Sequence, residues 1–233
     1  MIHPRNFASV VTALAVGTLS FTVIESAAAF TVYADRASFQ TQLRHTIVDD
    51  YEAPGYLSGN VSDSLAIDIF TDDAMSAVLG ETRYTTTGTL NRNIVVSGIV
   101  GESPNRQYCA GCNGSFLLDF THTSIGSSQG VFGAGFDVTS LTNYVAHATF
   151  GDGTTENFNL SGLRFFGLTA RKAIKTLHVG RRNGGSTNDA HGYIEIDNLT
   201  IGSNRNIPTP APLSGLVVTG IAALRKRKRK AAK

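Results

Sequence analysis

The sequence predicts an all-β fold, which we expect to be a single β-sandwich or jelly-roll-like domain with one short N-terminal helix and a C-terminal hydrophobic helix. Glycine is abundant, with 24 among 233 residues, and aromatic and β-branched residues are spread along the chain. Short apolar runs alternate with turn residues at near-regular spacing, which is typical of sandwiches and jelly rolls. The chain lacks the sequence repeats of solenoids and propellers.

The first half is expected to contain one helix and several short strands. Asp35 can cap a helix over 35–43, because its carboxylate can accept hydrogen bonds from amides of the first turn. Phe39 and Leu43 then fall on one face of that helix. Strands are expected at 31–33, 64–70, 83–87 and 93–100, and the stretch 101–114, which holds both cysteines, is expected to be a loop.

The second half shows a clearer strand pattern. Gly151-Asp152-Gly153 separates two alternating runs, and an Asp-Gly pair in this position indicates a β-hairpin in which Asp152 is a turn residue. Strands are expected at 115–120, 130–138, 144–150, 154–160, 165–168, 174–179 and 192–201.

The N-terminus has the form of a secretory signal peptide over residues 1–29. Arg5 supplies a positive charge before the apolar run 10–24, and the small residues Ala27 and Ala29 offer a cleavage site. A buried N-terminal helix is the weaker alternative. We therefore expect the β-sandwich domain to span 30–204.

Residues 205–233 combine a short motif, an apolar run and a basic end. The motif is Pro208-Thr209-Pro210-Ala211, and the apolar run Leu213–Leu224 is 12 residues long. A helix that spans a bilayer needs about 20 residues, and prolines interrupt an extension towards the N-terminus. We expect a marginal span that holds the chain at the membrane, with Arg225–Lys230 on the cytoplasmic side. An amphipathic surface helix with a basic tail is the alternative.

The motif Pro208-Thr209-Pro210-Ala211, the apolar segment and Arg225-Lys226-Arg227 together resemble the PEP-CTERM class of bacterial sorting signals, in its cyanobacterial PTPA-CTERM variant. The resemblance implies that an exosortase-like membrane protease or transpeptidase recognises the motif and cleaves near it. It also implies an exported protein that is held at the membrane before processing and then reaches the cell surface or the extracellular matrix. A membrane-retained protein with an uncut tail is the alternative.

A second resemblance covers residues 130–202. Phe165-Phe166-Gly167, Ile174-Lys175-Thr176-Leu177 and Ile196–Gly202 are similar to the C-terminal half of many PEP-CTERM proteins. The bodies of those proteins look like lectin-type or carbohydrate-binding β-sandwiches. The resemblance therefore implies a domain that contacts extracellular polysaccharide.

The ends of the chain hide the charge of its body. The whole chain has a net charge of +2, but residues 30–207 hold 12 basic and 17 acidic residues and carry a net charge of −5. This acidic balance argues against nucleic acid as a partner. A local group of cations is either a patch for acidic polysaccharide or, more simply, a solvated strand face: Arg171, Lys172, Lys175, Arg181 and Arg182.

Cys109 and Cys112 are the two cysteines of the chain. In an oxidising compartment we expect them to form a disulfide. A redox-active C-x-x-C would normally begin a helix, which the glycine- and asparagine-rich flanks do not predict. A zinc site would need further ligands, and the nearest histidine, His122, is isolated.

Glu52 and Asp197 are the candidate ligands of a structural Ca²⁺ ion. Carbohydrate-binding jelly rolls often hold such an ion where the first and last strands meet, and Ca²⁺ takes oxygen ligands from acidic side chains and carbonyls. Glu52 lies near the first strand and Asp197 in the last, with Asp49 and Asp50 able to assist. The alternative is that these are solvent-facing carboxylates at strand ends.

The sequence contains no G-x-S-x-G between a strand and a helix, as a nucleophile elbow requires, and no H-E-x-x-H or P-loop motif. A glycosidase needs only two facing carboxylates, but nothing in the sequence nominates one pair. We therefore expect a non-catalytic exported protein that binds glycan, and the alternative is a secreted glycan-active enzyme on a lectin-like sandwich. Six tyrosines could form a sugar-stacking surface or belong to the core: Tyr51, Tyr56, Tyr84, Tyr108, Tyr144 and Tyr193.

Overall fold

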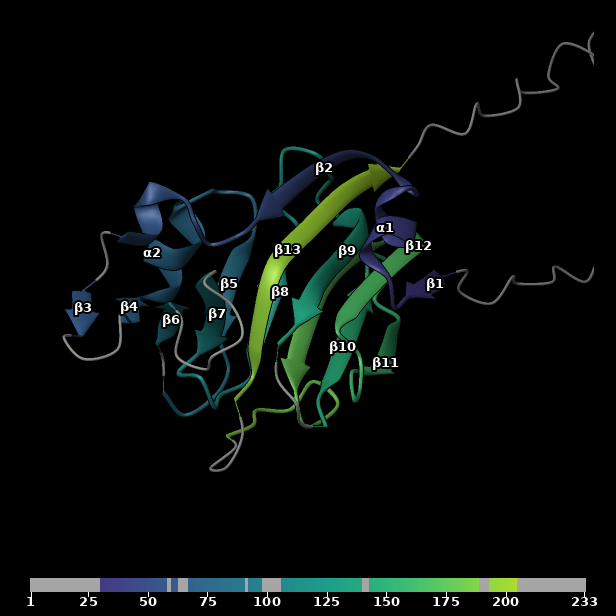
Figure 1. The fold of residues 1–233 in the computed structure, drawn as a ribbon. Helices are drawn as coiled ribbons and strands as arrows, with labels where there is room; N and C mark the ends of the chain where they lie inside the picture. Colours follow the sequence, from purple (N-terminus) through teal and green to yellow (C-terminus); the bar gives the residue numbers. More distant parts are fainter. Residues whose placement is uncertain are drawn as a thin grey trace, which may run out of the picture.

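One antiparallel sheet makes up most of the protein (Figure 1). The computed structural model describes residues 30–57, 60–62, 67–90, 92–97, 106–139, 143–188 and 193–204. Within these ranges, hydrogen bonds join 13 strands into the sheet. The prediction of an all-β fold is therefore confirmed.

The elements are short except for two strands near the C-terminus. The helical elements are α1 (Arg36–Gln40), the 3-10 helix η1 (Pro54–Leu57) and α2 (Asp72–Ala77). The strands are β1 (Phe30–Tyr33), β2 (Leu43–Asp49), β3 (Asn60–Ser62), β4 (Ile67–Phe70), β5 (Arg83–Thr86), β6 (Asn93–Ser97), β7 (Arg106–Ala110), β8 (Phe116–Asp119), β9 (Val131–Val138), β10 (Val145–Phe150), β11 (Thr155–Asn159), β12 (Phe165–Gly180) and β13 (Glu195–Asn204).

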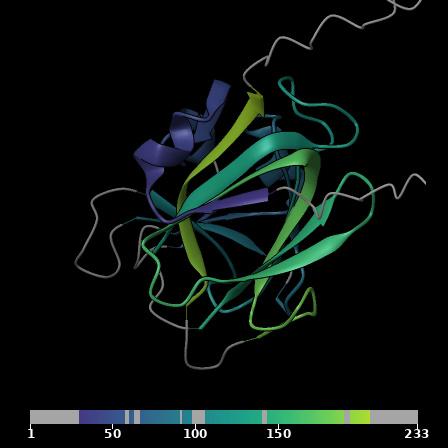
Figure 2. The ribbon, with the colours of Figure 1, turned by 90° about the vertical axis from the view of Figure 1, so that its right-hand side faces the viewer.

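Strand β12 connects two parts of the sheet, because its two halves have different neighbours. The first half pairs with β9 and β1, and the second half pairs with β10 and β8. From β12 the order runs through β9, β13, β7, β6, β4 and β3 in one direction and through β10 and β11 in the other. The sheet curves around its interior as a result (Figure 2).

The core-facing side of β12 changes phase within the strand. Its core residues are even-numbered up to Ile174 and odd-numbered from Leu177 onwards. The change falls at Lys175, the extra residue of a β-bulge, where the pairing register with Thr149 and Phe150 of β10 shifts. A one-residue slip moves side chains to the opposite face of a sheet. The bulge therefore lets both halves of β12 contribute to one core.

Helix α1 begins where the sequence predicts. The carboxylate of Asp35, its N-cap, accepts a hydrogen bond from the Ser38 amide at 2.7 Å. The helix is shorter than expected, because it ends at Gln40 and the chain enters β2 soon afterwards. Phe39 and Leu43 still share one side, where they form a small apolar cluster with Phe165.

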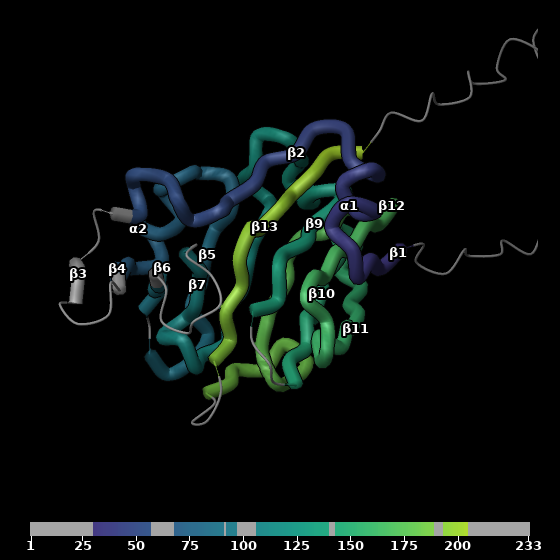
Figure 3. The backbone as a smooth tube through the Cα atoms, viewed as in Figure 1, coloured from purple at the N-terminus to yellow at the C-terminus, as the bar shows by residue number. Residues whose placement is uncertain are grey.

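Helix α1 and the start of β2 lie against the sheet (Figure 3), and glycines on its outer face make room for their side chains. A Cβ atom at Gly133 would lie 2.6 Å from Leu43, and one at Gly202 would lie 2.5 Å from the same side chain. At Gly167 an added Cβ would lie 2.9 Å from the Phe39 ring. Leu43 and Phe39 therefore pack directly against the backbone of these glycines.

The interior is rich in tyrosine. Tyr84 lies with its ring centroid 4.9 Å from that of Tyr108 and 6.4 Å from that of Tyr51. Their polar tips are satisfied within the core: the Asp49 carboxylate accepts hydrogen bonds from the hydroxyls of Tyr56 and Tyr84 at 2.6 and 2.7 Å. Burial raises the pKa of Asp49, although these hydrogen bonds oppose the rise.

Strands β10 and β11 form the predicted hairpin. The Phe150 amide donates to the Thr154 carbonyl at 2.9 Å, and the Asp152 carboxylate accepts a hydrogen bond from the Thr154 amide at 3.1 Å. Gly153 completes the turn with a φ of 84°, which glycine adopts without steric cost. The prediction of Asp152 as a turn residue is therefore confirmed.

Several expected elements differ from the structure. The loop expected at 101–114 is wrong over 106–110, which form β7 and include Cys109, whereas 111–113 form a turn and 101–105 lie outside the described residues. The two strands expected at 165–168 and 174–179 are one continuous strand. Helix α2 was not expected, although Thr71 caps it by accepting a hydrogen bond from the Ala74 amide. The expected C-terminal hydrophobic helix lies outside the described residues.

The space around two glycines predicts different costs of substitution. Gly130 has a φ of +112°, and an added Cβ would lie 1.9 Å from the Ile174 carbonyl oxygen. Gly153 also has a positive φ but has nothing within 4 Å of that position. We expect Gly153→Ala to lower the free energy of unfolding by about 1 kcal/mol through backbone strain alone. Gly130→Ala should cost at least about 3 kcal/mol, because its clash is with backbone. Urea unfolding of both variants tests this, and equal losses would contradict it.

Candidate functional site

The candidate site lies at a bulge in β13, on the outer face of the sheet. Asp197 pairs with Asp137 of β9 and Thr200 pairs with Gly135, so β13 accommodates one extra residue. That residue, Asn198, has a φ of 52°, in the left-handed region that asparagine tolerates better than most residues. Bulges redirect side chains, and this one brings Asp197 and Asn198 beside Asp137.

Hydrogen bonds and an ion pair connect these side chains. The Asn198 amide donates to Asp197 Oδ1 at 2.6 Å, and Asn198 Nδ2 donates to Asp137 Oδ2 at 2.9 Å. Arg36 Nη2 of α1 lies 2.7 Å from Asp137 Oδ1, and Arg36 Nη1 donates to Thr200 Oγ1 at 3.0 Å. Helix α1 is thereby tied to the bulge.

Arg36 has a second contact on this face. Its guanidinium carbon lies 4.9 Å from the centroid of the Phe165 ring, within the range of a cation–π interaction. Since Phe165 also packs against Phe39 of α1, the helix is anchored at both its charged and its apolar residues. Arg36 therefore supplies the positive charge of the site.

The two carboxylates of the site have different environments. Burial raises the pKa of Asp197 to about 6, and the charge of Asp137 adds to the rise, while the Asn198 amide and Arg36 oppose it. Asp137 is ion-paired and partly exposed. A buried carboxyl can act as a proton donor, while an ion-paired carboxylate beside it acts as the charged acceptor. This pair is one that the sequence alone could not nominate, because only the strand pairing brings it together.

The Glu52 carboxylate is engaged by Arg106, and its charge contributes to the raised pKa of Asp197. Its Oε1 accepts a hydrogen bond from the Arg106 amide at 2.6 Å, and Asp50 accepts one from the Glu52 amide. Asp49 belongs to the tyrosine network of the core. Within the described part of the chain, the groups of three or more metal-ligand side chains include neither Glu52 nor Asp197. A Ca²⁺ ion at Glu52 and Asp197 therefore stays a prediction, and the described side chains form no group of three metal ligands around these two residues.

Of the two roles considered for the six tyrosines, the structure assigns five to the core and leaves one at the surface. Of the six tyrosines considered for sugar stacking, Tyr193 is 59% exposed, and the other five are each at most 1% exposed. Tyr84 and Tyr108 lie on inward-facing positions of strands, Tyr51 and Tyr56 point into the core from the segment after β2, and Tyr144 directly precedes β10. The buried five are Tyr51, Tyr56, Tyr84, Tyr108 and Tyr144.

The cations of β12 and the following loop are exposed. Lys172 forms an ion pair with Asp152 of the neighbouring hairpin turn. This Lys172 contact, together with hydrogen bonds from Thr154, lowers the pKa of Asp152 to about 2. The exposure and the local pairing fit the solvated strand face that the sequence favours. The residues concerned are Arg171, Lys172, Lys175, Arg181 and Arg182.

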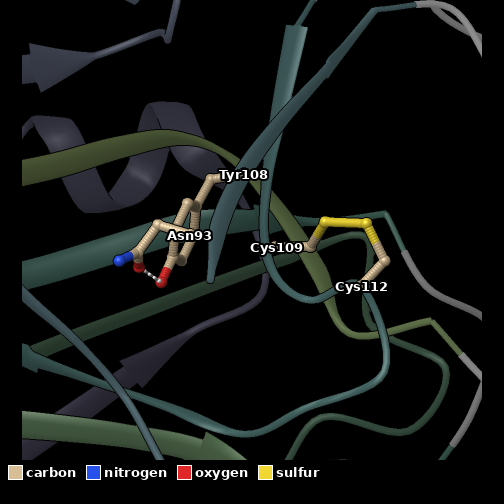
Figure 4. Close-up of a disulfide and its surroundings, with 4 residues drawn as sticks. All are labelled: Asn93, Tyr108, Cys109 and Cys112. Atoms are coloured by element: carbon tan, nitrogen blue, oxygen red, sulfur yellow. Dashed lines mark hydrogen bonds between the residues drawn. A yellow bond between two sulfur atoms is a disulfide. The ribbon is translucent and has the colours of Figure 1, made fainter. Parts of the chain in front are cut away.

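Cys109 and Cys112 form the predicted disulfide, with an S–S distance of 2.08 Å (Figure 4). The side chains of Cys109 and the adjacent Tyr108 point to opposite sides of β7, and the Tyr108 hydroxyl donates to Asn93 Oδ1 at 2.7 Å. Glu195 of β13 lies directly opposite Cys109 and offers a third ligand atom, all three lying within 4.8 Å of one another. Burial raises the pKa of Glu195. The sequence did not indicate Glu195, because it lies 83 residues after Cys112.

Polar side chains line the outer face of the sheet around β10 and β12. Asn157 lies opposite His147, which lies opposite His178. His147 Nδ1 is 2.7 Å from Asn157 Oδ1, and His178 Nε2 is 2.9 Å from Thr87 Oγ1. Burial lowers the pKa of His178 to about 4, so this ring is neutral at pH 7. An adjacent row across β11, β10, β12, β8 and β5 holds Thr155, Thr149, Thr176, Asp119 and Arg83.

The residues of the predicted terminal signals lie outside the described residues. They are Ala27 and Ala29 for signal cleavage and Pro208, Thr209, Pro210, Ala211, Arg225, Lys226 and Arg227 for sorting. A comparison with protein-family models, curated proteins and solved structures finds no match to this chain. No helix in the described ranges is both long enough and apolar enough to cross a bilayer. The resemblance to PEP-CTERM proteins therefore stays a prediction.

The raised pKa of Asp197 predicts that replacing its carboxyl group increases the free energy of unfolding, and that the increase depends on pH. Because the folded-state pKa lies above the ordinary value of 3.8, ionisation of Asp197 disfavours the folded state above about pH 6. We expect Asp197→Asn, which keeps the acceptor for the Asn198 amide, to raise the free energy of unfolding at pH 8 by about 2 kcal/mol. The gain should disappear near pH 4, where the wild-type carboxyl is protonated.

Asp152 provides a control of opposite sign. Its pKa is lowered to about 2, so its ionised form favours the folded state above pH 4. Asp152→Asn should therefore destabilise at neutral pH. Urea unfolding between pH 4 and pH 8 measures both variants, and a destabilised Asp197→Asn protein at pH 8 would contradict the prediction.

Proposed function

We propose that the chain is an exported, non-catalytic protein of the cell surface or extracellular matrix, whose body is a β-sandwich with a jelly-roll-like form that binds glycan. The observation that carries the proposal is the polar outer face of β11, β10, β12, β8 and β5. The terminal segments support the export route, and a disulfide between Cys109 and Cys112 suits an oxidising compartment.

The two halves of β12 support the sandwich interpretation. Phe166 and Leu168 of the first half and Leu177 and Val179 of the second half belong to one buried cluster. Sheet segments that share a core in this way bury one face and leave the other to solvent.

The loop after β12 covers part of the outward face of the second segment, since Gly184 lies against the His147 ring and His178 is buried. The rest of that face, with Asn157, Thr149 and Thr176, is open to a ligand.

The side chains on that face suit the hydroxyl groups of sugars. Asn157 is exposed, and His147, Thr149 and Thr176 are partly exposed. Amide, imidazole and hydroxyl groups both donate and accept hydrogen bonds, as sugar hydroxyls do. Because the body carries a net charge of −5, nucleic acid is a poor partner. A neutral or mixed extracellular polysaccharide fits this surface best.

The sorting resemblance supplies the route by which the domain would reach that polysaccharide. In this proposal Leu213–Leu224 holds the chain at the membrane until an exosortase-like enzyme cleaves near Pro208–Ala211. We expect a chain with an internal tag to appear at the surface or in the matrix, with a mass that lacks residues 1–29 and the basic end. Cell fractionation and intact-mass measurement test this. Cytoplasmic chain with both ends intact would overturn export, and a surface chain that retains Lys233 would overturn processing.

Glycan binding is tested with a glycan array and matched variants of the processed protein. We expect Asn157→Ala to weaken binding at least 10-fold, because it removes an exposed hydrogen-bonding group from the polar face. Glu156→Ala is the control, since neighbouring residues of a strand point to opposite faces and Glu156 pairs with the core residue Ala148. Arrays with calcium and with a chelator test the predicted Ca²⁺ dependence. Equal effects of both variants, or no bound glycan, would contradict the proposed face.

A secreted glycan-active enzyme is the second candidate. The observation that favours it is the Asp137–Asp197 pair, since side chains directly opposite on neighbouring strands are close together. A retaining glycosidase uses two carboxyl groups at about 5–5.5 Å, and a general acid with a raised pKa. Formation of new reducing ends during the array incubation, and its loss in Asp197→Asn, would establish this function instead.

A further inference from the structure

Cys109, Cys112 and Glu195 form a group of three ligand-bearing side chains that neither the glycan-binding face nor the Asp137–Asp197 pair uses. Their Sγ and carboxylate atoms all lie within 4.8 Å of one another. Two sulfur ligands with one carboxylate form a ligand set that zinc accepts in tetrahedral sites. The arrangement therefore combines a disulfide with a third zinc-type ligand at hand.

We propose that reduction of the Cys109–Cys112 disulfide converts this group into a three-ligand zinc site. Disulfide sulfurs are not the thiolate ligands that zinc binds, so the oxidised chain has at most Glu195 to offer. The reduced chain offers two thiolates and a carboxylate. A fourth position remains for water, as in zinc sites with three protein ligands.

The backbone, rather than the disulfide, sets the positions of these ligands. Glu195 and Cys109 are direct partners in the β13–β7 pairing. The Cys112 carbonyl accepts a hydrogen bond from the Ile194 amide at 2.9 Å, and the Gly114 amide donates to the Ala110 carbonyl at the same distance. These bonds remain when the S–S bond is broken, so the three ligands stay together.

Glu195 is available to a metal ion. No side chain or backbone amide within the described ranges donates a hydrogen bond to its carboxylate, and it lies half-buried beside the two sulfurs. The acidic residues at the bulge are different, because Arg36 already occupies Asp137 and Arg106 occupies Glu52. The disulfide end of β7 therefore offers a cation a carboxylate beside two sulfur atoms, with no donor among the described residues bound to it.

The redox step is a thiol–disulfide exchange with a dithiol reductant. Cys109 is fully buried and Cys112 is partly exposed, so the reductant thiolate attacks Cys112 Sγ and Cys109 leaves as a thiolate. The second thiol of the reductant then displaces Cys112 and closes its own disulfide. The reductant thus loses two electrons and two protons to the cysteine pair, and zinc binding releases the two thiol protons to solvent.

The experiment uses the full chain without an affinity tag, reduced with a dithiol and separated from it under argon. Co²⁺ serves as the spectroscopic probe, and Zn²⁺ affinity is measured by competition with a chromophoric chelator. We expect the reduced chain to bind one equivalent of Co²⁺ with a sulfur-to-cobalt charge-transfer absorption. The oxidised chain should show no such absorption.

Variants at the site distinguish it from adventitious binding. Glu195→Gln should weaken Zn²⁺ binding at least 10-fold while the cysteines remain, and Cys112→Ser should abolish the charge-transfer band. Glu52→Gln is the matched control, since its carboxylate is bound by Arg106, and its Zn²⁺ affinity should equal that of the wild type. Circular dichroism should show the same strand signal before and after reduction. Unfolding on reduction, no metal binding, or equal affinity in Glu195→Gln and wild type would each overturn the proposal.

Discussion

The hydrogen bonding of β12 on both of its edges, with different partners along its length, constrains the rest of the structure. A strand that pairs with β9 and β1 in its first half and with β10 and β8 in its second must bury side chains of both halves in one interior. Strict alternation over 16 residues would turn one half outwards. The extra residue at Lys175 resolves this conflict, and its own exposed position is a consequence of that role.

The bulge in β13 solves a related problem in another strand of the same sheet. Ile196 and Leu199 are both buried in the core although they are three positions apart, so one residue between them must be extra. Asn198 fills that position in a left-handed conformation and donates hydrogen bonds to both neighbouring carboxylates. The buried Asp197 is thereby satisfied in part by the same residue that interrupts the strand. The same bulge thus keeps Ile196 and Leu199 in the core and brings Asp137 and Asp197 together, which explains why polar side chains gather at this point.

Local signals in the sequence predicted the elements that depend on local physics. The Asp35 cap and the Asp152 turn are set by hydrogen bonds within a few residues, and both were correctly placed. Strand β7 was missed because its flanks are rich in turn residues, while its stability comes from β6 and β13, distant in sequence. The same limit applies to the sites: no local pattern could show that Glu195 lies opposite Cys109 or that Asp137 lies opposite Asp197. The tyrosines illustrate the converse, since residue type alone suits both a sugar platform and a core, and only burial decides.

The position of the disulfide acquires meaning from the sheet order. Strand β7 carries β6, β4 and β3, yet it pairs with β13 through only two residues in the described part of the sheet, Glu195 with Cys109 and Ile196 with Tyr108. So short a junction needs support from beyond the ladder. The Ile194 amide bonded to Cys112 extends the contact on one side, and the Tyr108 ring, packed between Tyr51, Tyr84 and Phe116, secures it on the core side. The disulfide joins β7 only to its own turn, whereas a metal ion bound by Cys109, Cys112 and Glu195 would link β7 to β13 at this junction. A ligand that binds only the folded state stabilises that state. Metal binding at this junction would therefore raise the stability of the whole domain.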